Sequence, residues 1–344
     1  MVYLKTLCTA ALIILATTSA PPRLKPQSSG TTAHLRGVSA AGARVAWASG
    51  SKGTYLRTTD AGLTWEKGTA PDASSLDFRD VHAVDADTAY LLATSGKIYK
   101  TSDGGRNWSL QYNNTAEGVF LDSCAFWDPR RGIALGDPMN DGFLILTTND
   151  GGATWHQVPS ASIPPAIKGE ASFAASGTCI AVEGKSNVWF ATGGKAARVF
   201  RSADGGHVWK VSNTPIISGA DSTGIFSIAF RDSRNGIVVG GDYKKPDAVT
   251  DNAARTGDGG ATWTLVQRAR PNGFRSCVAY VGGRSTLVAV GEKGCDYSTD
   301  GGATWTALGK EGYHAISIHS SGHVWAVGAN GTIAAFEDIV PGQR

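Results

Sequence analysis

One eight-residue pattern, [ST]-x-D-x-G-x-x-W, constrains the fold of this chain more than any other feature, because it recurs six times. The copies read TTDAGLTW at 58–65, TSDGGRNW at 101–108, TNDGGATW at 148–155, SADGGHVW at 202–209, TGDGGATW at 256–263 and STDGGATW at 298–305. Their aspartates are 43, 47, 54, 54 and 42 residues apart. A period of this length with turn signals is typical of the blades of a β-propeller.

Composition supports many short strands joined by tight turns. The 344 residues include 44 glycines and 10 tryptophans, and only 18% of them are charged. Each period divides into four strands, with the boxed loop between the third and the fourth. In the second period we expect strands at 79–84, 88–94, 97–101 and 107–111.

A seventh unit follows the last box. Segments 314–318, 323–327 and 332–336 match the first three strands, and Asp338 stands at the box position without its glycines and Trp. A closed ring pairs its edges, so a strand at about 24–31 should complete this blade. We therefore predict an all-β, seven-bladed propeller of four-stranded antiparallel blades, closed by an N-terminal strand, as one domain over 21–344. Six or eight blades remain alternatives.

The box residues are interpreted as structural. The Asp and Ser/Thr side chains can bond the backbone of their own turn, glycines supply positive φ, and the Trp packs beneath the loop. The spacing of a calcium loop is missing, and we expect no metal or cofactor. The residues concerned are Asp60, Asp103, Asp150, Asp204, Asp258, Asp300, Trp65, Trp108, Trp155, Trp209, Trp263 and Trp305.

The N-terminus predicts export. Lys5, an apolar run at 7–16 and small residues at 17–20 indicate a signal peptide over 1–20; an uncleaved anchor is the alternative. Either way, the folded part is expected outside the cytoplasm, secreted or periplasmic. Of the remaining cysteines, Cys124, Cys179 and Cys277 share one core column and Cys295 falls in another, and only Cys124 and Cys179 are close enough in the repeat to consider a disulfide.

The rim opposite the boxes carries the candidate binding residues. The strand order brings the connections between blades and those between second and third strands to this rim. The first residues of the blades form a column: Arg36, Arg79, Asp122, Gly177, Phe226, Arg275 and His314. The basic members fall on blades six, seven, one and two, which are consecutive around a closed ring. The carboxylates of this rim fall on blades three to five, except that Glu292 on blade six breaks the pattern. The predicted partner-binding rim is Arg36, Arg79, Arg275, His314, Asp122, Asp137, Glu170, Asp242 and Tyr243.

Two interpretations of this rim remain open. Opposite charges on its two sides could orient a charged partner. Alternatively, the arginines could pair with the carboxylates and close the central channel. Long connections at 158–177 and 242–254 lie on the same rim, where a rigid scaffold usually carries its binding loops.

The boxes are similar to the Asp-box, or bacterial neuraminidase repeat. Seven such blades behind an export signal resemble the photosystem II stability/assembly factor family. That resemblance implies a non-enzymatic, monomeric scaffold outside the cytoplasm that holds a protein partner, such as an integral membrane protein, through an arginine patch. Arg36, Arg79 and Arg275 are the candidates for that patch.

Two other functions stay open. Sialidases carry the same repeat, so a glycoside hydrolase using Asp137 and Glu170 is one alternative. Against it, sialidases usually have six blades and an Arg-Ile-Pro motif that this chain lacks. Carbohydrate binding through Tyr243, Phe274 and Tyr313 is the other. A net charge of only +3 argues against nucleic-acid binding.

Overall fold

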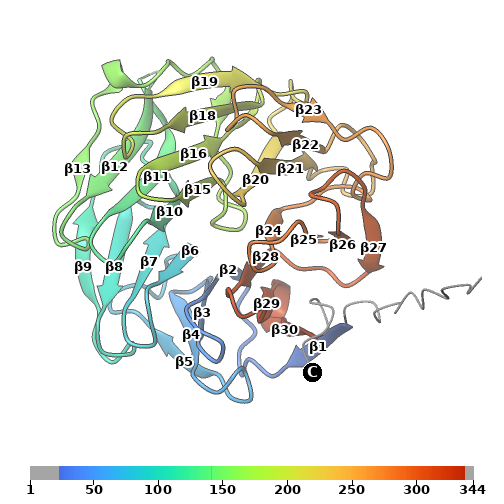
Figure 1. The fold of residues 1–344 in the computed structure, drawn as a ribbon. Coiled ribbons are helices and arrows are strands. Elements are labelled where there is room, and N and C mark those ends of the chain that lie inside the picture. The colour runs from blue at the N-terminus through green and yellow to red at the C-terminus, as the bar shows by residue number, and fades with distance from the viewer. Residues whose placement is uncertain (1–22, 141, 338–344) are drawn as a thin grey trace, which may run out of the picture.

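The computed structural model describes residues 23–140 and 142–337, which form seven sheets arranged radially around a central channel (Figure 1). The proposed signal peptide and Asp338 lie outside the described residues. Within the described ranges, no helix has the length and apolar character needed to cross a membrane. The seven-bladed, four-stranded antiparallel architecture predicted from the repeat is confirmed.

Each blade runs from an inner to an outer strand. Blade one contains β2 (Leu35–Ala40), β3 (Ala46–Gly50), β4 (Thr54–Thr58) and β5 (Glu66–Thr69); blade two, β6 (Phe78–Ala83), β7 (Ala89–Ala93), β8 (Lys97–Thr101) and β9 (Ser109–Asn113); blade three, β10 (Leu121–Phe126), β11 (Gly132–Met139), β12 (Gly142–Thr148) and β13 (His156–Gln157). Blade four contains β15 (Ile180–Glu183), β16 (Asn187–Ala191), β18 (Arg198–Ser202) and β19 (Lys210–Asn213); blade five, β20 (Thr223–Phe230), β21 (Gly236–Asp242), β22 (Ala253–Thr256) and β23 (Thr264–Leu265); blade six, β24 (Cys277–Tyr280), β25 (Leu287–Gly291), β26 (Gly294–Ser298) and β27 (Thr306–Gly309).

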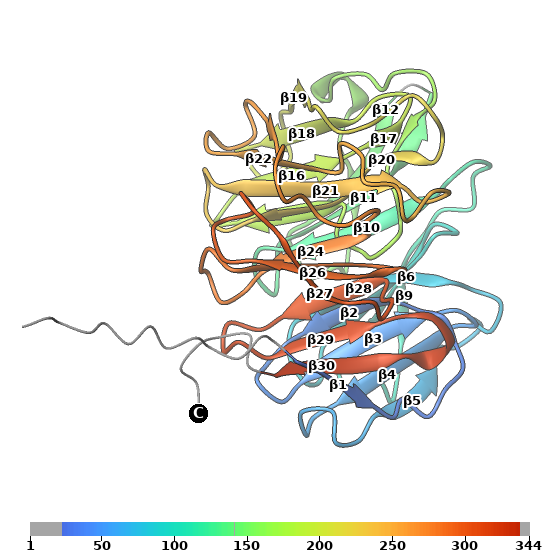
Figure 2. The same cartoon turned by 90° about the vertical axis from the view of Figure 1, so that its right-hand side faces the viewer.

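The seventh blade joins the two ends of the described chain. Its inner strands β28 (Ala315–Ile318), β29 (Val324–Val327) and β30 (Ile333–Glu337) are completed by β1 (Arg23–Gln27). β1 pairs antiparallel with β30, with Leu24 opposite Phe336 (Figure 2). The predicted closure by an N-terminal strand is therefore confirmed, over a shorter segment than expected.

Four short elements depart from the repeat. Two-residue strands β14 (Glu170–Ala171) and β17 (Gly193–Gly194) extend the inner edge of blade five. Two 3-10 turns are present, η1 (Ser160–Ser162) and η2 (Ala329–Gly331).

The core lies mainly between neighbouring blades. Phe126 stacks on Tyr90 with ring centroids 4.3 Å apart, and Phe230 stacks on Trp189 at 3.7 Å. Cys124, Cys179, Cys277 and Cys295 are all buried free thiols within this core. Apolar columns facing the next blade therefore hold the ring together.

The boxed turns bond internally. In the third box, Oγ1 of Thr148 accepts the Gly152 N–H at 2.9 Å, and Oδ1 of Asp150 accepts the Thr154 N–H at 2.9 Å. The same two bonds recur in the other five boxes. The hydroxyl and then the N–H of the threonine four residues on donate to the carboxylates of Asp60, Asp150 and Asp258, and these hydrogen bonds lower the pKa of each to about 2.

Candidate binding site at the mouth of the central channel

Four residues of the predicted rim column lie at β-bulges near the channel. In β2, β6, β10 and β20 the register shifts at one residue near the start of the strand. The extra residues are Arg36, Arg79, Asp122 and Phe226. A bulge leaves its extra residue outside the ladder and turns its side chain, which is how one strand position acquires a separate role in four blades.

A strap formed by residues 172–178 crosses the channel on its way from blade three to blade four. Ser123 Oγ donates to the Gly177 carbonyl at 2.6 Å, and Ser176 Oγ donates to the Ser276 carbonyl of blade six at 2.8 Å. The hydroxyl of Thr178 lies 2.7 Å from that of Ser227 in blade five. The strap is thus fixed to opposite sides of the ring.

Gly177 allows this close crossing. Its φ is +71°, and a Cβ added there would lie 2.0 Å from Oδ1 of Asp80. Only glycine combines this conformation with this contact. The strap divides the channel, with a cavity of about 310 Å³ lined by Asp80 and His82 on the box side.

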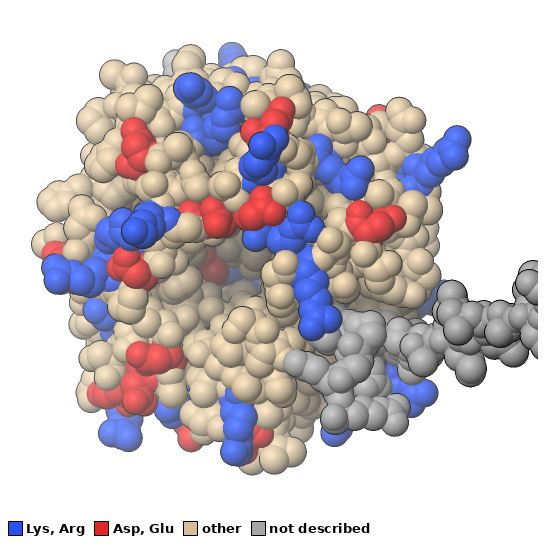
Figure 3. Space-filling model, in the orientation of Figure 1, with Lys and Arg blue, Asp and Glu red and all other residues tan. Residues whose placement is uncertain are grey.

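Figure 3 shows positive and negative side chains interspersed around a hollowed centre in the orientation of Figure 1.

On the other side of the strap lies a pocket of about 490 Å³, the channel-mouth pocket. Its lining combines two kinds of side chain: charged or titratable ones, Arg36, Arg79, His314, Asp137 and Glu292, and aromatic ones, Phe120, Phe173, Phe226, Tyr243 and Phe274. Phe173 of the strap stacks on Phe226, with centroids 4.0 Å apart and an interplanar angle of 4°. Such a pocket can hold a ligand that combines a negative charge with an apolar group.

Arg36 and Arg79 provide the positive charge. Arg79 pairs with Asp77 at 2.7 Å and keeps 29% of its side chain exposed. Burial, followed by the charge of Arg79, lowers the pKa of Arg36, and its Nε has no hydrogen-bond partner among the described residues. Burial also lowers the pKa of His314, which donates from Nδ1 to the Leu35 carbonyl at 2.8 Å. His314 is therefore a neutral wall residue at pH 7.

Two neighbouring carboxyl groups of this rim, Asp122 and Asp137, have raised pKa values. Asp122 is fully buried, and neither of its oxygens has a hydrogen-bond partner among the described residues. Burial and the neighbouring Asp137 raise the pKa of Asp122 well above its usual value, against the opposing effect of Arg79. Burial raises the pKa of Asp137 to about 6, although it accepts the Ser172 N–H at 2.9 Å. The expected contrast between a basic and an acidic side of the rim is thus weakened.

Arg275 and Glu170 do not line the channel-mouth pocket. Arg275 is 1% exposed and donates from Nε to Asp296 at 2.6 Å inside blade six. Glu170 accepts from Nε of Arg198 at 2.9 Å and from the Thr192 hydroxyl at 2.6 Å. Both residues are in buried ion pairs, but their partners Asp296 and Arg198 are not among the predicted rim residues, so these pairs are not the pairing of rim arginines with rim carboxylates that the channel-closing interpretation expected.

The remaining predicted rim residues lie near the pocket. Asp242 is buried and accepts the Lys244 N–H at 3.0 Å, which shapes the loop after β21. Its neighbour Tyr243 is 44% exposed and lines the pocket. The structure therefore brings Arg36, Arg79, His314, Asp137 and Tyr243 together, places Asp122 behind them and Asp242 beside them.

The glycosidase candidates Asp137 and Glu170 border a shallow hollow of about 420 Å³ next to the pocket. The Glu170 side chain is fully buried against Arg198, so only one of the two carboxylates can reach a ligand there. Within 23–140 and 142–337, no three or more His, Cys, Asp and Glu residues gather as a metal site would require.

Sequence reasoning missed the strap and its Phe173. The long 158–177 connection was a signal for this region, but the strap has no counterpart in the other blades. Glu292, which broke the charge pattern of the rim, proves to line the pocket, with Oε1 3.8 Å from Nε2 of His314.

Comparison with known proteins agrees with this architecture. Residues 23–124 match the family model for the photosystem II assembly factor YCF48, and residues 296–307 match the BNR/Asp-box repeat. A search of curated proteins returns no match.

Solved structures with the same fold include YCF48 bound to a D1 peptide, at 18% identity and a TM-score of 0.66, covering 93% of this chain and 98% of that one. YCF48 from Cyanidioschyzon merolae is 19% identical with a TM-score of 0.66, covering 92% and 99%. A GH74 xyloglucanase from Xanthomonas campestris is 17% identical with a TM-score of 0.65, covering 91% of this chain and 53% of that one. The chain is an Asp-box propeller of seven blades that resembles the photosystem II assembly factor family, by sequence over residues 23–124 and by fold around the whole ring.

Proposed function

We propose that the channel-mouth pocket binds a segment of a protein partner, and that the chain acts outside the cytoplasm as a non-catalytic scaffold. The observation that carries this proposal is that Arg36 and Arg79 line the same pocket as several aromatic side chains. Guanidinium groups bind carboxylates well, and the stacked Phe173 and Phe226 offer a flat apolar surface. A peptide carrying a carboxylate beside an apolar side chain has this chemistry.

The surroundings of the pocket extend the apolar surface. Phe120 is 37% exposed, Ile167 46%, Tyr243 44% and Val249 53%, and all four lie in connections of this rim. Exposed aromatic and aliphatic side chains gathered around a pocket are typical of protein-binding sites. They support a partner that contacts the rim beyond the pocket itself.

The kind of partner is inferred from the resemblance. YCF48, a propeller with the same fold, has been solved with a D1 peptide, which supports a peptide as the occupant here. An integral membrane protein, reached from outside the cytoplasm, is our proposed partner. The signal-like N-terminus supports that location.

Capture of a partner from membrane extracts tests the proposal. We expect Arg79→Glu and Phe173→Ala each to reduce capture by about tenfold or more, since each removes a charged or aromatic anchor. Arg106→Glu is the matched control, because Arg106 is exposed in the boxed loop of the same blade. Unchanged capture by Arg79→Glu, with the variant folded, would refute the assignment of the pocket.

Peptides derived from the captured protein then test the carboxylate. Binding should be weaker when the peptide carboxylate facing Arg36 and Arg79 is converted to an amide. A panel of sialosides and aryl glycosides should show no turnover. Hydrolysis that disappears in Asp137→Asn would instead establish an enzyme at this rim.

A further inference from the structure

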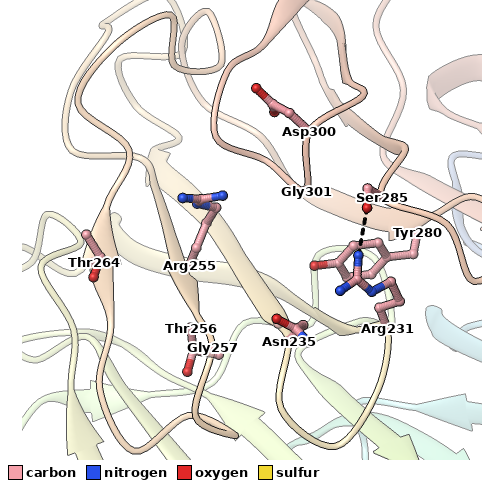
Figure 4. A pocket seen from close by; sticks show the side chains of 11 residues that line it. Arg231, Asn235, Arg255, Thr256, Gly257, Thr264, Tyr280, Ser285, Asp300 and Gly301 are labelled. Atoms are coloured by element: carbon pink, nitrogen blue, oxygen red, sulfur yellow. Dashed lines mark hydrogen bonds between the residues drawn. The ribbon is translucent and has the colours of Figure 1, made fainter.

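Another cavity, of about 330 Å³, lies between blades five and six near their boxed turns (Figure 4). Arg231 and Asn235 reach it from the turn between β20 and β21, and Arg255 and Thr264 from β22 and β23. Blade six contributes Tyr280, Ser285, Asp300 and Gly301. Neither the rim nor the strap takes part in this cavity.

Arg255 occupies a position that joins blades elsewhere in the ring. The residue before the box Ser/Thr is Arg57 in blade one, Lys100 in blade two and Arg201 in blade four. Lys100 donates to the Gly151 carbonyl of the next box at 2.7 Å, and Arg201 donates to the Gly260 carbonyl at 2.9 Å. Arg57 donates to the Ala86 carbonyl of the next blade at 2.7 Å and pairs with Asp87.

The junction of blades five and six lacks such a contact. Cδ of Arg255 is close to Gly302 of the next box. The backbone of Arg255 pairs within blade five, but its guanidinium makes no hydrogen bond or ion pair with any residue that the structure describes. The turn between β24 and β25, at 281–286, contains no acid, whereas the corresponding turns of blades two, three and five contain Asp85, Asp128 and Asp232. Arg255 is therefore a half-buried cation left without a counter-ion.

Other donors face the same space. Nη1 of Arg231 donates to Oγ of Ser285 at 2.7 Å, which leaves the Ser285 hydroxyl hydrogen free to donate (Figure 4). The Tyr280 hydroxyl makes no hydrogen bond within the described part of the chain. Burial raises the pKa of Tyr280 to about 12; the charge of Arg231 opposes that rise, the charge of Asp232 adds to it, and the charge of Arg255 opposes it less strongly.

The charges of the lining favour an anion. Asp300 is committed to its own box, where its carboxylate accepts from the Thr304 N–H, the Thr304 hydroxyl and the Ser298 hydroxyl. Asp232 pairs with Arg231 at 3.3 Å. Neither of these carboxylates is paired with Arg255, so its positive charge is not balanced by an acid of the lining.

We propose that this cavity binds a small oxyanion of the phosphate or sulfate type, held by Arg255 and Arg231 with the hydroxyls of Ser285 and Tyr280. A tetrahedral oxyanion presents several acceptors to a guanidinium fork and to hydroxyl donors at once. The bound ion supplies the acceptor that the protein itself provides to Lys100 and Arg201, and so it joins blades five and six. The ligand is either the free ion or the phosphoryl group of a larger molecule.

Titration of the folded protein with inorganic phosphate, inorganic sulfate and glycerol 3-phosphate, each against chloride at matched ionic strength, tests the site. Calorimetry gives the affinity, and the shift in Tm gives an independent measure of binding. We expect saturable binding of at least one oxyanion, weakened by about tenfold or more in Arg255→Gln. Arg201→Gln is the matched control, because Arg201 stands at the same repeat position with its acceptors in place.

Every outcome is informative. Binding confined to the inorganic ions identifies a free ion, and equal or tighter binding of the monoester identifies a phosphoryl group. A response to all salts alike, or an affinity unchanged in Arg255→Gln, would overturn the proposal. Arg255→Gln should fold normally, since the guanidinium of Arg255 makes no hydrogen bond or ion pair with the described residues.

Discussion

The aspartates of the boxed turns and those around the channel are the same side chain in two opposite environments. Asp150 and Asp258 are exposed and Asp60 is half-buried; all three accept hydrogen bonds from their own turns, and the pKa of each is lowered to about 2. Asp80 and Asp122 are buried near the strap, and burial raises the pKa of both. Local hydrogen bonds set the pKa of the box aspartates, and desolvation sets the pKa of Asp80 and Asp122.

Because of this difference, the contributions of the two regions to folding stability change in opposite directions with pH. A carboxyl with a lowered folded-state pKa stabilises the fold above its unfolded pKa, and that contribution is lost in acid. A carboxyl with a raised pKa stabilises the protonated folded state, and that contribution is lost as pH rises through the folded pKa. Acid should therefore weaken the boxed turns while favouring the channel-side packing.

The largest expected effect comes from turning a paired buried carboxylate into an unpaired one. Arg275→Ala leaves Asp296 buried without its partner, in the situation of Asp122, and should cost about 3–5 kcal/mol in the free energy of unfolding. Urea denaturation at pH 7 measures it. Arg36→Ala, which removes a guanidinium without a hydrogen-bonded acid, is the control and should cost far less. If both variants lost a similarly small free energy of unfolding, the buried Asp296 carboxylate would not need its ion-pair partner.

The next effect concerns Asp80, whose pKa burial raises to about 7 even though it accepts the Cys124 N–H at 2.7 Å. Between about pH 4 and pH 7 the folded state keeps a proton that the unfolded chain releases, so stability falls as pH rises. Asp80→Asn should remove roughly 2–4 kcal/mol of this fall, at about 1.4 kcal/mol per pKa unit. Unfolding free energies at the two ends of this range, compared between wild type and variant, provide the measurement. A slope that Asp80→Asn leaves unaltered would assign the effect to Asp122 and Asp137.

The smallest effect lies in the boxes, where the hydroxyl is more deeply buried than the aspartate. Thr148→Val leaves the buried Gly152 N–H without an acceptor and should cost about 1–2 kcal/mol. Thr147→Val is the matched control at the adjacent position of β12 and should stay within about 0.5 kcal/mol. If the two variants were equally stable, the glycines and the Trp alone would determine the geometry of the box.

The sequence predicted the features that depend on local repetition. The period of the repeat predicted the boxed turns, the number of blades, the order of the strands and the closure of the ring. Four residues of the predicted rim column, Arg36, Arg79, Asp122 and Phe226, lie at β-bulges in the structure. The pairs Arg275–Asp296 and Glu170–Arg198 could not be anticipated, because their partners come from strands whose side-chain direction the repeat does not specify. Phe173 belongs to an insertion found in one blade only.

The pairing of β1 with β30 has a consequence for how the molecule is made. β1 precedes the other strands that the structure describes, and its partner β30 is the last of them, so the other six blades can form before this pair closes the ring. Contacts between such distant segments form slowly. Until they form, β30 presents an unpaired edge to which another chain could add a strand. The newly made protein is therefore most exposed to misassembly at a single seam, and a mutation that weakens β1 should act there first.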